Sequence, residues 1–477
     1  MSLVFYNSYS RQKEPFETLD PGLKPEIVRM YNCGPTVYGR QHIGNFRAFL
    51  FADTLRRWLE VKGYEVRQVM NITDVGHLVA DAEEGDDKIQ VQALKEGKSP
   101  QEIAEGYTQL FLADLKALGC LPAMAYPRAT AHIDDMLAII ERLIASGHAY
   151  CAGPAGENVY FDVSKFERYG KLSGNRVADL VAGARVDVRD EKRHPADFAL
   201  WKSDPKHLMK WPSAYGEHGF PGWHIECSAM ARALLGDQLD IHTGGEDNVF
   251  PHHECEIAQS EALTGKTFAR FWMHTRFLTV DGGKMSKSLG NVYTLDDVRA
   301  RGYDLRTLRY ALIRGHYRSP LDFTWKVMDE CKSALAGLDE MVSVLEQAEL
   351  AAAPSAGENE ALNLSKAFSQ AMDEDLNLPQ ALGALFALRQ DVLQRKIGGK
   401  DAVDLVTQLL AKADNALGIL PARDNSVNAS IEAKVDARNA AKAARDFATA
   451  DRIRKELEHD GIVLQDTPGG KTIWRRA

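Results

Sequence analysis

Two cysteines, one histidine and one glutamate are the residues of this sequence best suited to hold a metal ion. Cys33 follows a segment of alternating apolar and polar residues, and Cys227 stands in the stretch HIECSAM. His252 and Glu256 are four residues apart in PHHECEIA, so a helix would place both on one face. Two thiolates, one imidazole and one carboxylate would make a tetrahedral zinc site.

The spacing leaves other ligand sets open. Cys255 or His253 could serve in place of one of these residues. Cys33 and Cys227 could also be buried apolar side chains, because a free thiol packs well in a core. The pattern therefore predicts the kind of site and leaves its ligand set undecided.

A second group of residues is suited to phosphate. Gln41 and the HIGN segment, His42–Asn45, stand where a predicted strand and turn meet a predicted helix, and free backbone N–H groups there favour an anion. Gly44 allows a nucleotide to approach closely, and His42 and Asn45 are short polar donors. The alternative is a plain helix cap.

A third group carries positive charge. Gly282 and Gly283 precede the KMSKS segment, Lys284–Ser288, in which Lys284 and Lys287 are three residues apart. Such a loop can close over a triphosphate and place ammonium charge where negative charge develops. A basic loop standing alone would more often be a solvated surface.

The elements that must position these residues begin with a βαβ unit. Alternation over 27–37 predicts a strand, apolar spacing from Phe46 to Glu60 predicts a helix ended by Lys62-Gly63, and Tyr64–Thr73 predicts the next strand. This order predicts a parallel sheet with right-handed crossovers. A second βα pattern returns at Pro221.

The remaining sequence divides into an insertion and a helical part. Short strand-like pieces, among them Ala155–Val163 and Ala184–Val188, lie in a mixed region between Arg128 and Trp211. Residues 305–420 have the composition and spacing of a helical bundle, and PARDNSVNAS at 421–430 separates a small terminal module.

Composition limits the classes of function. The chain has 477 residues and a formal net charge of −9, which argues against wholesale coating of nucleic acid and for local contacts. Its six cysteines form no CxxC pair, so a disulfide framework is not expected. We expect no membrane segment, because no run of 18 apolar residues occurs, and therefore a cytoplasmic protein.

HIGN and KMSKS together resemble the paired signatures of class I aminoacyl-tRNA synthetases, although Asn45 stands where that family more often has a second histidine. Eight motifs are similar, in sequence and in order, to those of the cysteinyl-tRNA synthetase family. They are YNCGPTVYG, NITD, PRAT, GARVDV, DFALWK, PGWHIECSAM, FPHHECEIAQS and KMSKSLGN. The resemblance spans nearly the whole chain.

The resemblance assigns roles to residues by position. It implies one zinc ion per chain, held by Cys33, Cys227, His252 and Glu256, with the substrate thiolate bound to the metal. It implies a cysteine pocket near Gly34, Thr73, Trp223 and His242. It implies that ATP, with Mg²⁺, is bound and activated by His42, Gly44, Asn45, Gly244, Gly245, Asp247, Lys284 and Lys287. It implies contacts with tRNA at Lys442, Asp451, Asp466 and Trp474.

The fold expected from these patterns is α/β, with a Rossmann-type catalytic domain, an inserted connective domain, a helical bundle and a terminal anticodon-binding module. The expected boundaries are 1–127 and 212–275 for the catalytic domain, 128–211 for the insertion, 276–325 for the stem-contact region with KMSKS, 326–420 for the bundle, 421–430 for a linker and 431–477 for the terminal module.

The expected function is cysteine–tRNA ligation by a monomer, with tRNA(Cys), cysteine and ATP as partners. Two alternatives remain open. A ligase could use the same adenylating site to join cysteine to an amino-sugar, or a non-catalytic paralogue could bind tRNA around a structural zinc. The terminal sequence GIVLQDTPGGKTIWRR opposes the first, and the presence of both lysines and all four ligand candidates opposes the second.

Overall fold

The computed structural model describes residues 2–78, 85–176, 191–286, 289–346, 350–351, 353–421, 425–460, 462–466 and 472–476. The chain divides into two compact units. The first comprises Met1–Cys331 and Ser369–Ala381, and the second comprises Lys332–Phe368 and Leu382–Ala477.

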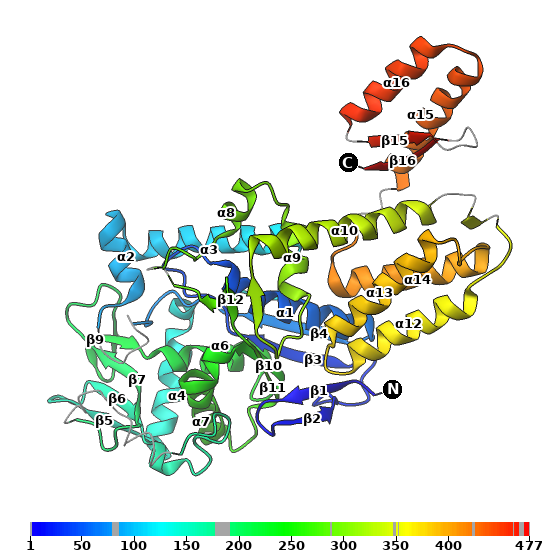
Figure 1. The fold of residues 1–477 in the computed structure, drawn as a ribbon. Coiled ribbons are helices and arrows are strands. Elements are labelled where there is room, and N and C mark those ends of the chain that lie inside the picture. Colours follow the sequence, from blue (N-terminus) through cyan, green and yellow to red (C-terminus); the bar gives the residue numbers. More distant parts are fainter. Residues whose placement is uncertain are drawn as a thin grey trace. The chain divides into compact units, whose positions relative to one another are not determined.

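The first unit is built on a four-stranded parallel sheet with the order β11-β10-β3-β4. Its strands are β3 (Ile27–Asn32), β4 (Glu65–Met70), β10 (Leu239–Gly245) and β11 (Ala269–Thr275). Helix α1 (Ile43–Val61) lies on one side of the sheet, and α6 (Trp223–Leu235) and α7 (Glu254–Thr264) lie on the other (Figure 1). The predicted parallel α/β architecture is confirmed.

The sequence of α1 explains its bounds. His42 caps the first turn, and the apolar residues expected from the spacing pack inward, among them Phe46, Leu50 and Leu59, which are buried. The helix ends at Lys62, and Gly63 follows with φ 94°, a conformation that glycine adopts without strain.

The strand order creates a switch point at the carboxyl ends of the central strands. β3 continues through α1 to β4, whereas its neighbour β10 continues through α7 to β11 on the other side. The two connections therefore leave in opposite directions from the carboxyl ends of β3 and β10. Ligands of open parallel sheets bind at such a switch point.

A second sheet lies within the inserted region. It is five-stranded with the order β5-β6-β7-β9-β8 and antiparallel pairing throughout. Its strands are β5 (Ala149–Ala152), β6 (Asn158–Phe161), β7 (Phe198–Ser203), β8 (Trp211–Ser213) and β9 (Gly216–Pro221). The sheet runs on to Pro221, past the expected boundary at Trp211, because β9 pairs with β7. The strand expected at Ala184–Val188 lies outside the described residues.

Smaller elements complete the first unit. They are β1 (Val4–Asn7), β2 (Gln12–Pro15), α2 (Lys88–Glu96), α3 (Pro100–Ala117), η2 (Ala129–His132), α4 (Ile133–Ala145), η3 (Val163–Lys165), η4 (Glu246–Asn248), η5 (Val249–His253), β12 (Leu278–Val280), β13 (Gly283–Lys284), α8 (Leu295–Ala300), α9 (Leu305–Ile313) and β14 (Leu321–Phe323). β12, β13 and β14 form a small three-stranded sheet that carries the start of the KMSKS segment.

The C-terminal part is helical, as predicted. Its helices are α10 (Trp325–Leu345), α12 (Glu358–Asp373), α13 (Leu378–Leu393), α14 (Lys400–Leu417), α15 (Asn425–Ala443) and α16 (Phe447–His459), followed by the hairpin β15 (Ile462–Asp466) and β16 (Thr472–Arg476). The second half of the expected linker is helical, since α15 begins at Asn425. Within the described ranges, no helix is both long and apolar enough to cross a membrane.

The terminal module has a small core of its own. Six apolar residues from α15, α16 and β15 are buried together: Ile431, Val435, Ile453, Leu457, Ile462 and Leu464.

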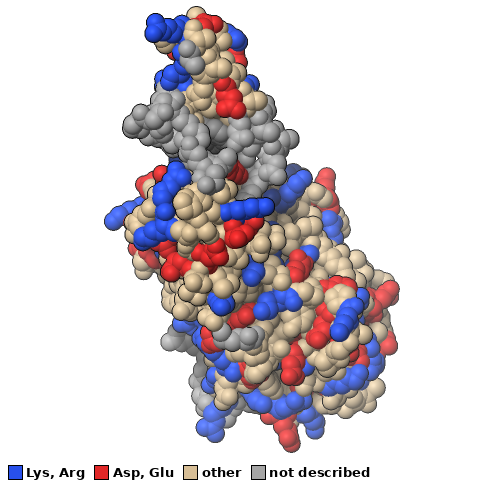
Figure 2. Space-filling model, turned by 90° about the vertical axis from the view of Figure 1, so that its right-hand side faces the viewer, with Lys and Arg blue, Asp and Glu red and all other residues tan. Residues whose placement is uncertain are grey.

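On the face shown in Figure 2, the Lys and Arg side chains of the described residues are interspersed with Asp and Glu. This distribution agrees with the expectation that contacts with nucleic acid are local.

A buried ion pair joins α1 to α9. Arg309 is 1% exposed and lies 2.5 Å from the carboxylate of Asp53, and it also donates to the carbonyl of Leu118. Arg57 binds the same carboxylate at 2.7 Å from a more exposed position. Without Arg309, the buried carboxylate of Asp53 would keep only the more exposed Arg57, and its charge would be incompletely compensated.

We therefore predict that Arg309→Met lowers the free energy of unfolding by about 3 kcal/mol or more, because Asp53 loses its buried partner. Urea unfolding followed by circular dichroism measures this loss. Arg57→Met is the matched control and should cost less, since Arg309 would still pair with Asp53. Equal losses in the two variants would contradict the assignment.

Candidate metal and nucleotide site

The predicted metal-ligating residues converge at the switch point of the parallel sheet. Cys33 directly follows β3, and Cys227 lies on α6. His252 lies in the π-helical turn η5 that leads into α7, and Glu256 lies in the first turn of α7. One ligand atom from each of the four residues lies within 4.8 Å of the others. Segments nearly 200 residues apart in sequence are thus brought to one point.

The carboxylate of this cluster is fully buried and charged. Glu256 is 0% exposed, and its two oxygens face His242 at 2.9 Å and His252 at 3.1 Å. Burial alone would raise the pKa of Glu256, but the charge of His242 and the hydrogen bonds from His242 and His252 outweigh burial and lower this pKa to about 2. A buried anion is therefore built into the site.

The imidazole and one thiol complete the charge pattern. Burial opposes charge on His252, yet the charge of Cys227 and hydrogen bonds to Cys227 and Glu256 raise the pKa of His252 to about 10. Burial also opposes a thiolate, but a hydrogen bond from Cys33 and the charge of His252 lower the pKa of Cys227 to about 6. Cys227 is thus favoured as a thiolate and His252 as a protonated imidazole. A divalent cation could take the place of that proton in balancing the anionic donors.

A second set of four ligand atoms satisfies the same distance limit. It keeps Cys33 and Glu256 but replaces the other two ligands with His242 and His253. His253 Nε2 lies 3.1 Å from Cys33 Sγ, but 3.9 Å from Glu256. His242 binds the far oxygen of Glu256, the arrangement by which an outer residue orients a ligating carboxylate. The set with Cys227 and His252 offers two sulfurs and one imidazole, which suits zinc better.

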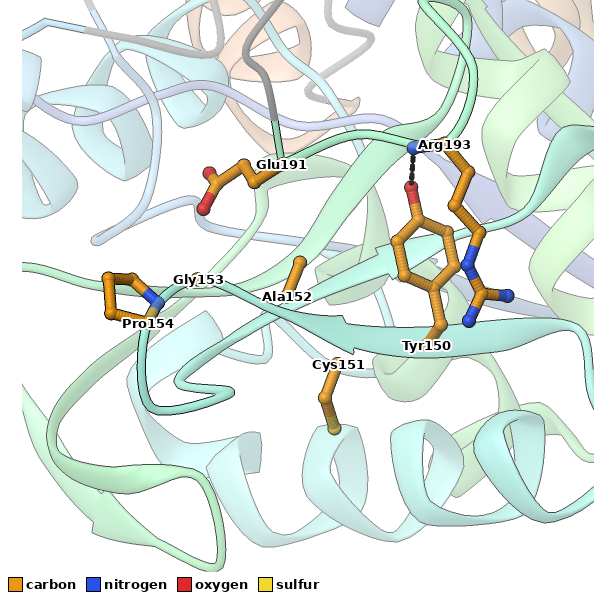
Figure 3. A pocket seen from close by; sticks show the side chains of 7 residues that line it. All are labelled: Tyr150, Cys151, Ala152, Gly153, Pro154, Glu191 and Arg193. Carbon is orange, nitrogen blue, oxygen red and sulfur yellow. Dashed lines mark hydrogen bonds between the residues drawn. The ribbon is translucent and has the colours of Figure 1, made fainter.

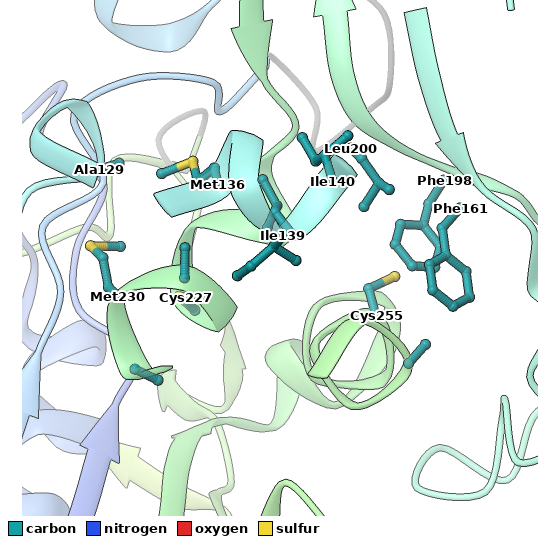
Figure 4. Close-up of a cluster of buried hydrophobic side chains, with 14 of the residues drawn as sticks. Ala129, Met136, Ile139, Ile140, Phe161, Phe198, Leu200, Cys227, Met230 and Cys255 are labelled. Atoms are coloured by element: carbon teal, nitrogen blue, oxygen red, sulfur yellow. The ribbon is translucent and has the colours of Figure 1, made fainter. Parts of the chain in front are cut away.

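Cys255, the other alternative from the sequence, faces away from this cluster. It is buried in the apolar core, its side chain points toward Phe161 and Phe198 (Figure 4), and its sulfur lies 3.5 Å from the hydroxyl of Tyr169. Its place on α7 decides this orientation, because a residue adjacent to Glu256 projects to another side of the helix.

Three further histidines lie around the cluster: His253, which the sequence offered as an alternative ligand, and His224 and His274, which it did not single out. His224 Nδ1 lies 2.9 Å from His252 Nδ1, so the second nitrogen of His252 is engaged and its ring is fixed. His253 Nδ1 lies 2.8 Å from His274 Nε2, and His274 Nδ1 lies 2.8 Å from the hydroxyl of Ser8. Burial lowers the pKa of His253 well below its usual value and that of His274 to about 3.

Beside the cluster, a hydrogen-bonded row joins Gly34 to Thr73. The Gly34 N–H donates to Asn71 Oδ1 at 2.8 Å, Asn71 Nδ2 donates to Thr73 Oγ1 at 3.1 Å, and Thr73 Oγ1 donates to Glu226 at 3.0 Å. A Cβ on Gly34 would lie 1.7 Å from the carbonyl oxygen of Asn71, so only glycine fits. Asn71 and Glu226 are positioning residues that sequence reasoning missed.

Trp223 stands between two imidazoles. Its ring is stacked on that of His77, with centroids 3.9 Å apart and 11° between planes. Its centroid also lies 4.4 Å from the ring centroid of His252. His77 is held in turn by Thr36 and by Lys88, whose ammonium donates to its Nε2 at 2.7 Å. The indole is thereby fixed beside the metal cluster, where the resemblance places the cysteine pocket.

The HIGN segment forms the amino-terminal cap of α1. His42 Nδ1 accepts from the N–H of Asn45 at 3.3 Å, and Asn45 Oδ1 accepts from the N–H of His42 at 3.1 Å. This reciprocal capping box gives Asn45 a structural role that the sequence left undefined. Gly44 is packed closely, because a Cβ there would lie 3.0 Å from the methyl carbon of Met285.

The KMSKS segment begins on β13 and is closed at its base by Asn291. Lys284 ends β13, and Lys287 lies outside the described residues. Asn291 Oδ1 accepts from the N–H of Ser286 at 2.8 Å, while its Nδ2 donates to the carbonyl of Lys284 at 3.2 Å. Met285 lies against Gly44, so the described start of KMSKS lies beside the HIGN segment.

The predicted adenosine turn follows the end of β10. Gly244 and Gly245 are its last two residues, and Asp247 lies in η4. A Cβ on Gly244 would lie 2.8 Å from the ring of His253, and one on Gly245 would lie 2.3 Å from Asp247 Oδ1. A side chain at either position would have to displace the side chain of His253 or Asp247. The turn lies at the same sheet edge as Cys33.

The predicted tRNA-contacting residues lie in the terminal module. Lys442 is in the last turn of α15, and Asp451 is an exposed residue of α16. Asp466 and Trp474 lie on β15 and β16, which pair antiparallel. The four positions thus come from four different elements of one small fold.

A surface pocket elsewhere holds none of the predicted site residues. It is lined by Tyr150, Cys151, Ala152, Gly153, Pro154, Glu191 and Arg193 at the β5 end of the inserted sheet (Figure 3). The Tyr150 hydroxyl donates to Asp197 at 2.7 Å and accepts from the N–H of Arg193 at 2.8 Å. The hydroxyl of Tyr150 is thus fully engaged, and the carboxylate of Glu191 accepts from the hydroxyl of Tyr160 at 2.6 Å.

Comparisons with known families match nearly the whole chain. The family model described as "tRNA synthetases class I (C) catalytic domain" matches residues 20–333, and the one described as "DALR domain" matches residues 367–421. The protein "Cysteine--tRNA ligase" of Chlorobaculum tepidum is 44% identical, covering 99% of this chain and 98% of the relative. Its namesake in Symbiobacterium thermophilum is 45% identical and covers 100% of both chains.

A solved structure supports the fold. The structure described as "Mycobacterium tuberculosis methionyl-tRNA synthetase in complex with methionyl-adenylate" matches with a TM-score of 0.60 and 15% identity, covering 82% of this chain and 89% of that chain. At this identity the likeness shows the fold alone.

The geometry predicts which cysteine holds the metal. Cys227→Ser should lose most of the bound zinc because serine offers no soft thiolate, whereas Cys255→Ser, on the core side of α7, should retain it. Zinc content of the purified variants, measured by mass spectrometry of the metal, is the test. Loss of zinc in Cys255→Ser, or His253→Ala losing zinc while His252→Ala keeps it, would reverse the assignment.

Proposed function

From the premise that this chain belongs to the cysteine–tRNA ligase family of class I aminoacyl-tRNA synthetases, we propose that it activates cysteine with ATP and selects cysteine over serine through zinc. The product would be a cysteinyl group on the 3′-terminal ribose of tRNA(Cys). The convergence of Cys33, Cys227, His252 and Glu256 at the switch point is the observation that carries the proposal.

The donor set fits zinc and the selection it would provide. Bound zinc would lower the pKa of the substrate thiol so that sulfur coordinates as a thiolate, whereas the hydroxyl of serine would stay protonated. A hydrophobic pocket could separate these substrates by only ~1–3 kcal/mol. Glu256, oriented by His242, supplies a fixed anion within the same cluster as the sulfur ligands.

The chain's own residues would hold the amino acid beside the metal. The row that joins Gly34, Asn71, Thr73 and Glu226 fixes the backbone at the end of β3 and the hydroxyl of Thr73. Trp223, clamped by His77, provides a flat wall. These rigid contacts support a pocket in which the α-amino and carboxylate groups take one orientation.

ATP would lie between HIGN and KMSKS. A carboxylate oxygen of cysteine would attack the α-phosphorus in line, forming the mixed anhydride while the bond to pyrophosphate breaks. Lys284 and Lys287 would stabilise the charge on the departing pyrophosphate, with Mg²⁺ on the phosphates. Gly44 lets the phosphates approach the start of α1, and Gly244 and Gly245 let the adenosine approach β10.

The terminal module supports transfer to tRNA over the amino-sugar alternative. A ligase for a small acceptor needs no separate folded module, yet residues 431–477 carry ten Lys and Arg against eight Asp and Glu and have their own core. Lys442, Asp451, Asp466 and Trp474 are the proposed contacts with unpaired anticodon bases. We also propose that the enzyme is a cytoplasmic monomer.

Chelation should separate cysteine from serine. Cysteine-dependent ATP–pyrophosphate exchange should fall at least tenfold after zinc removal and recover on addition of Zn²⁺, because selection would need the metal. Serine-dependent exchange should stay near background throughout. Exchange with cysteine that is unchanged in zinc-free protein would overturn the zinc proposal, and activity with neither amino acid would overturn the ligase proposal.

Truncation should separate activation from transfer. A chain that ends at Ser430 should keep cysteine-dependent exchange within about twofold, since the site lies in the first unit, and should charge tRNA(Cys) at least tenfold more slowly because a set of anticodon contacts worth over 1.4 kcal/mol is lost. Both rates are measured on one preparation. Parallel loss of both would mean that the module only stabilises the fold.

A further inference from the structure

Arg40 binds two carboxylates from two other elements. It stands in the turn between β3 and α1, two residues before His42. Its Nε and one terminal nitrogen donate to Asp114 of α3 at 3.2 and 2.9 Å. The other terminal nitrogen donates to Asp296 of α8 at 2.5 Å. One guanidinium thus joins the segment before HIGN to α3 and α8.

The two carboxylates differ in burial. Asp114 is 3% exposed and holds Arg40 by a two-point contact, so it fixes the plane of the guanidinium. Asp296 is 56% exposed and also pairs with Arg299 at 3.0 Å. Asp114 is therefore the fixed anchor, and Asp296 is the partner that can separate.

α8 follows the KMSKS segment, here called the KMSKS loop, a few residues later in the chain. Asn291 closes this loop at its base, and the carbonyl of Tyr293 accepts from the N–H of Ile43 at 2.9 Å. The pair of Arg40 and Asp296 comes three residues further on. Three contacts thus join this stretch to the start of α1. Met285 lies against Gly44, and the carbonyl of Tyr293 accepts from the N–H of Ile43. Asp296 pairs with Arg40.

The charge of Arg40 is already satisfied by these carboxylates. A guanidinium that faced phosphate would need a free edge, but the terminal nitrogens and Nε of Arg40 all donate to Asp114 or Asp296. Its position favours mechanical coupling over direct contact with ATP.

We propose that Arg40 is a positioning residue that, anchored by Asp114, holds α8 through Asp296 and so keeps the KMSKS loop against the HIGN segment. The inference rests on the proposed function, in which this loop acts on the phosphates of ATP. Losing the pair would let the loop spend more time away from the nucleotide. The cost would fall on ATP and spare cysteine, whose proposed site lies at Cys33 and Cys227.

The test is steady-state ATP–pyrophosphate exchange by the zinc-loaded, full-length enzyme. Asp296→Asn should raise the KM for ATP about threefold, the size expected for a partly exposed ion pair, with the KM for cysteine and the zinc content unchanged. The difference from the unaltered enzyme should shrink in 0.5 M NaCl, because salt screens exposed pairs. A change that only loosened the fold would not follow salt in this way.

Arg299→Ala is the matched control, because it removes the second partner of Asp296 and leaves Arg40 in place. The KM for ATP of this variant should equal that of the unaltered enzyme. Arg40→Gln should raise the KM for ATP more than Asp296→Asn does. Adding Asp296→Asn to Arg40→Gln should raise the KM for ATP little further, since the pair would already be broken. Thermal unfolding of Arg40→Gln shows whether unpaired Asp114 has damaged α3.

An unchanged KM for ATP in Asp296→Asn would overturn the inference, as would full additivity of the two substitutions. A rise in the KM for both substrates, independent of salt, would likewise contradict it. If the unaltered enzyme shows no cysteine-dependent exchange, the proposed function fails, and this outcome is distinct from failure of the Arg40 inference.

Discussion

The charge of Glu256 is the constraint on which the site depends. A carboxylate with no exposure to water is costly to keep ionised unless positive charge or strong donors surround it. Two imidazoles face its oxygens, and two thiols lie within the same small cluster. A divalent cation among these donors would satisfy the same charge while displacing protons from Cys33 and His252. We therefore propose that the site is organised around cation binding and that its selectivity follows from the softness of that cation.

The parallel sheet solves the problem of bringing these donors together. β3 delivers Cys33 and Gly34, and its neighbour β10 delivers His242 and the glycine turn, both at their carboxyl ends. α6 and α7, packed beside each other on one side of the sheet, supply Cys227 and Glu256, and η5, which leads into α7, supplies His252 (Figure 1). The amino acid and the nucleotide can thus share one edge, because the same switch point that gathers the metal ligands also exposes the start of α1.

Sequence reasoning predicted the parts that depend on local pattern. The βαβ unit, the helical C-terminal part and the four-residue spacing of His252 and Glu256 follow from periodicity. It could not choose between Cys227 and Cys255, because the packing of α6 and α7 decides which thiol faces the cluster. Asn71, Glu226 and Arg40 are ordinary polar residues whose roles arise only when distant segments meet. The end of the inserted sheet could not be read from local pattern for the same reason, since β9 is defined by its pairing with β7.

X-ray absorption at the zinc edge tests the central claim most directly, because it counts the sulfur atoms bound to the metal in the full-length enzyme. The account predicts two sulfur ligands in the substrate-free protein, three after addition of cysteine, and two after addition of serine. A sulfur count that stays at two with saturating cysteine would contradict selection by thiolate coordination. A zinc ion without sulfur ligands in the free enzyme would contradict the ligand set itself.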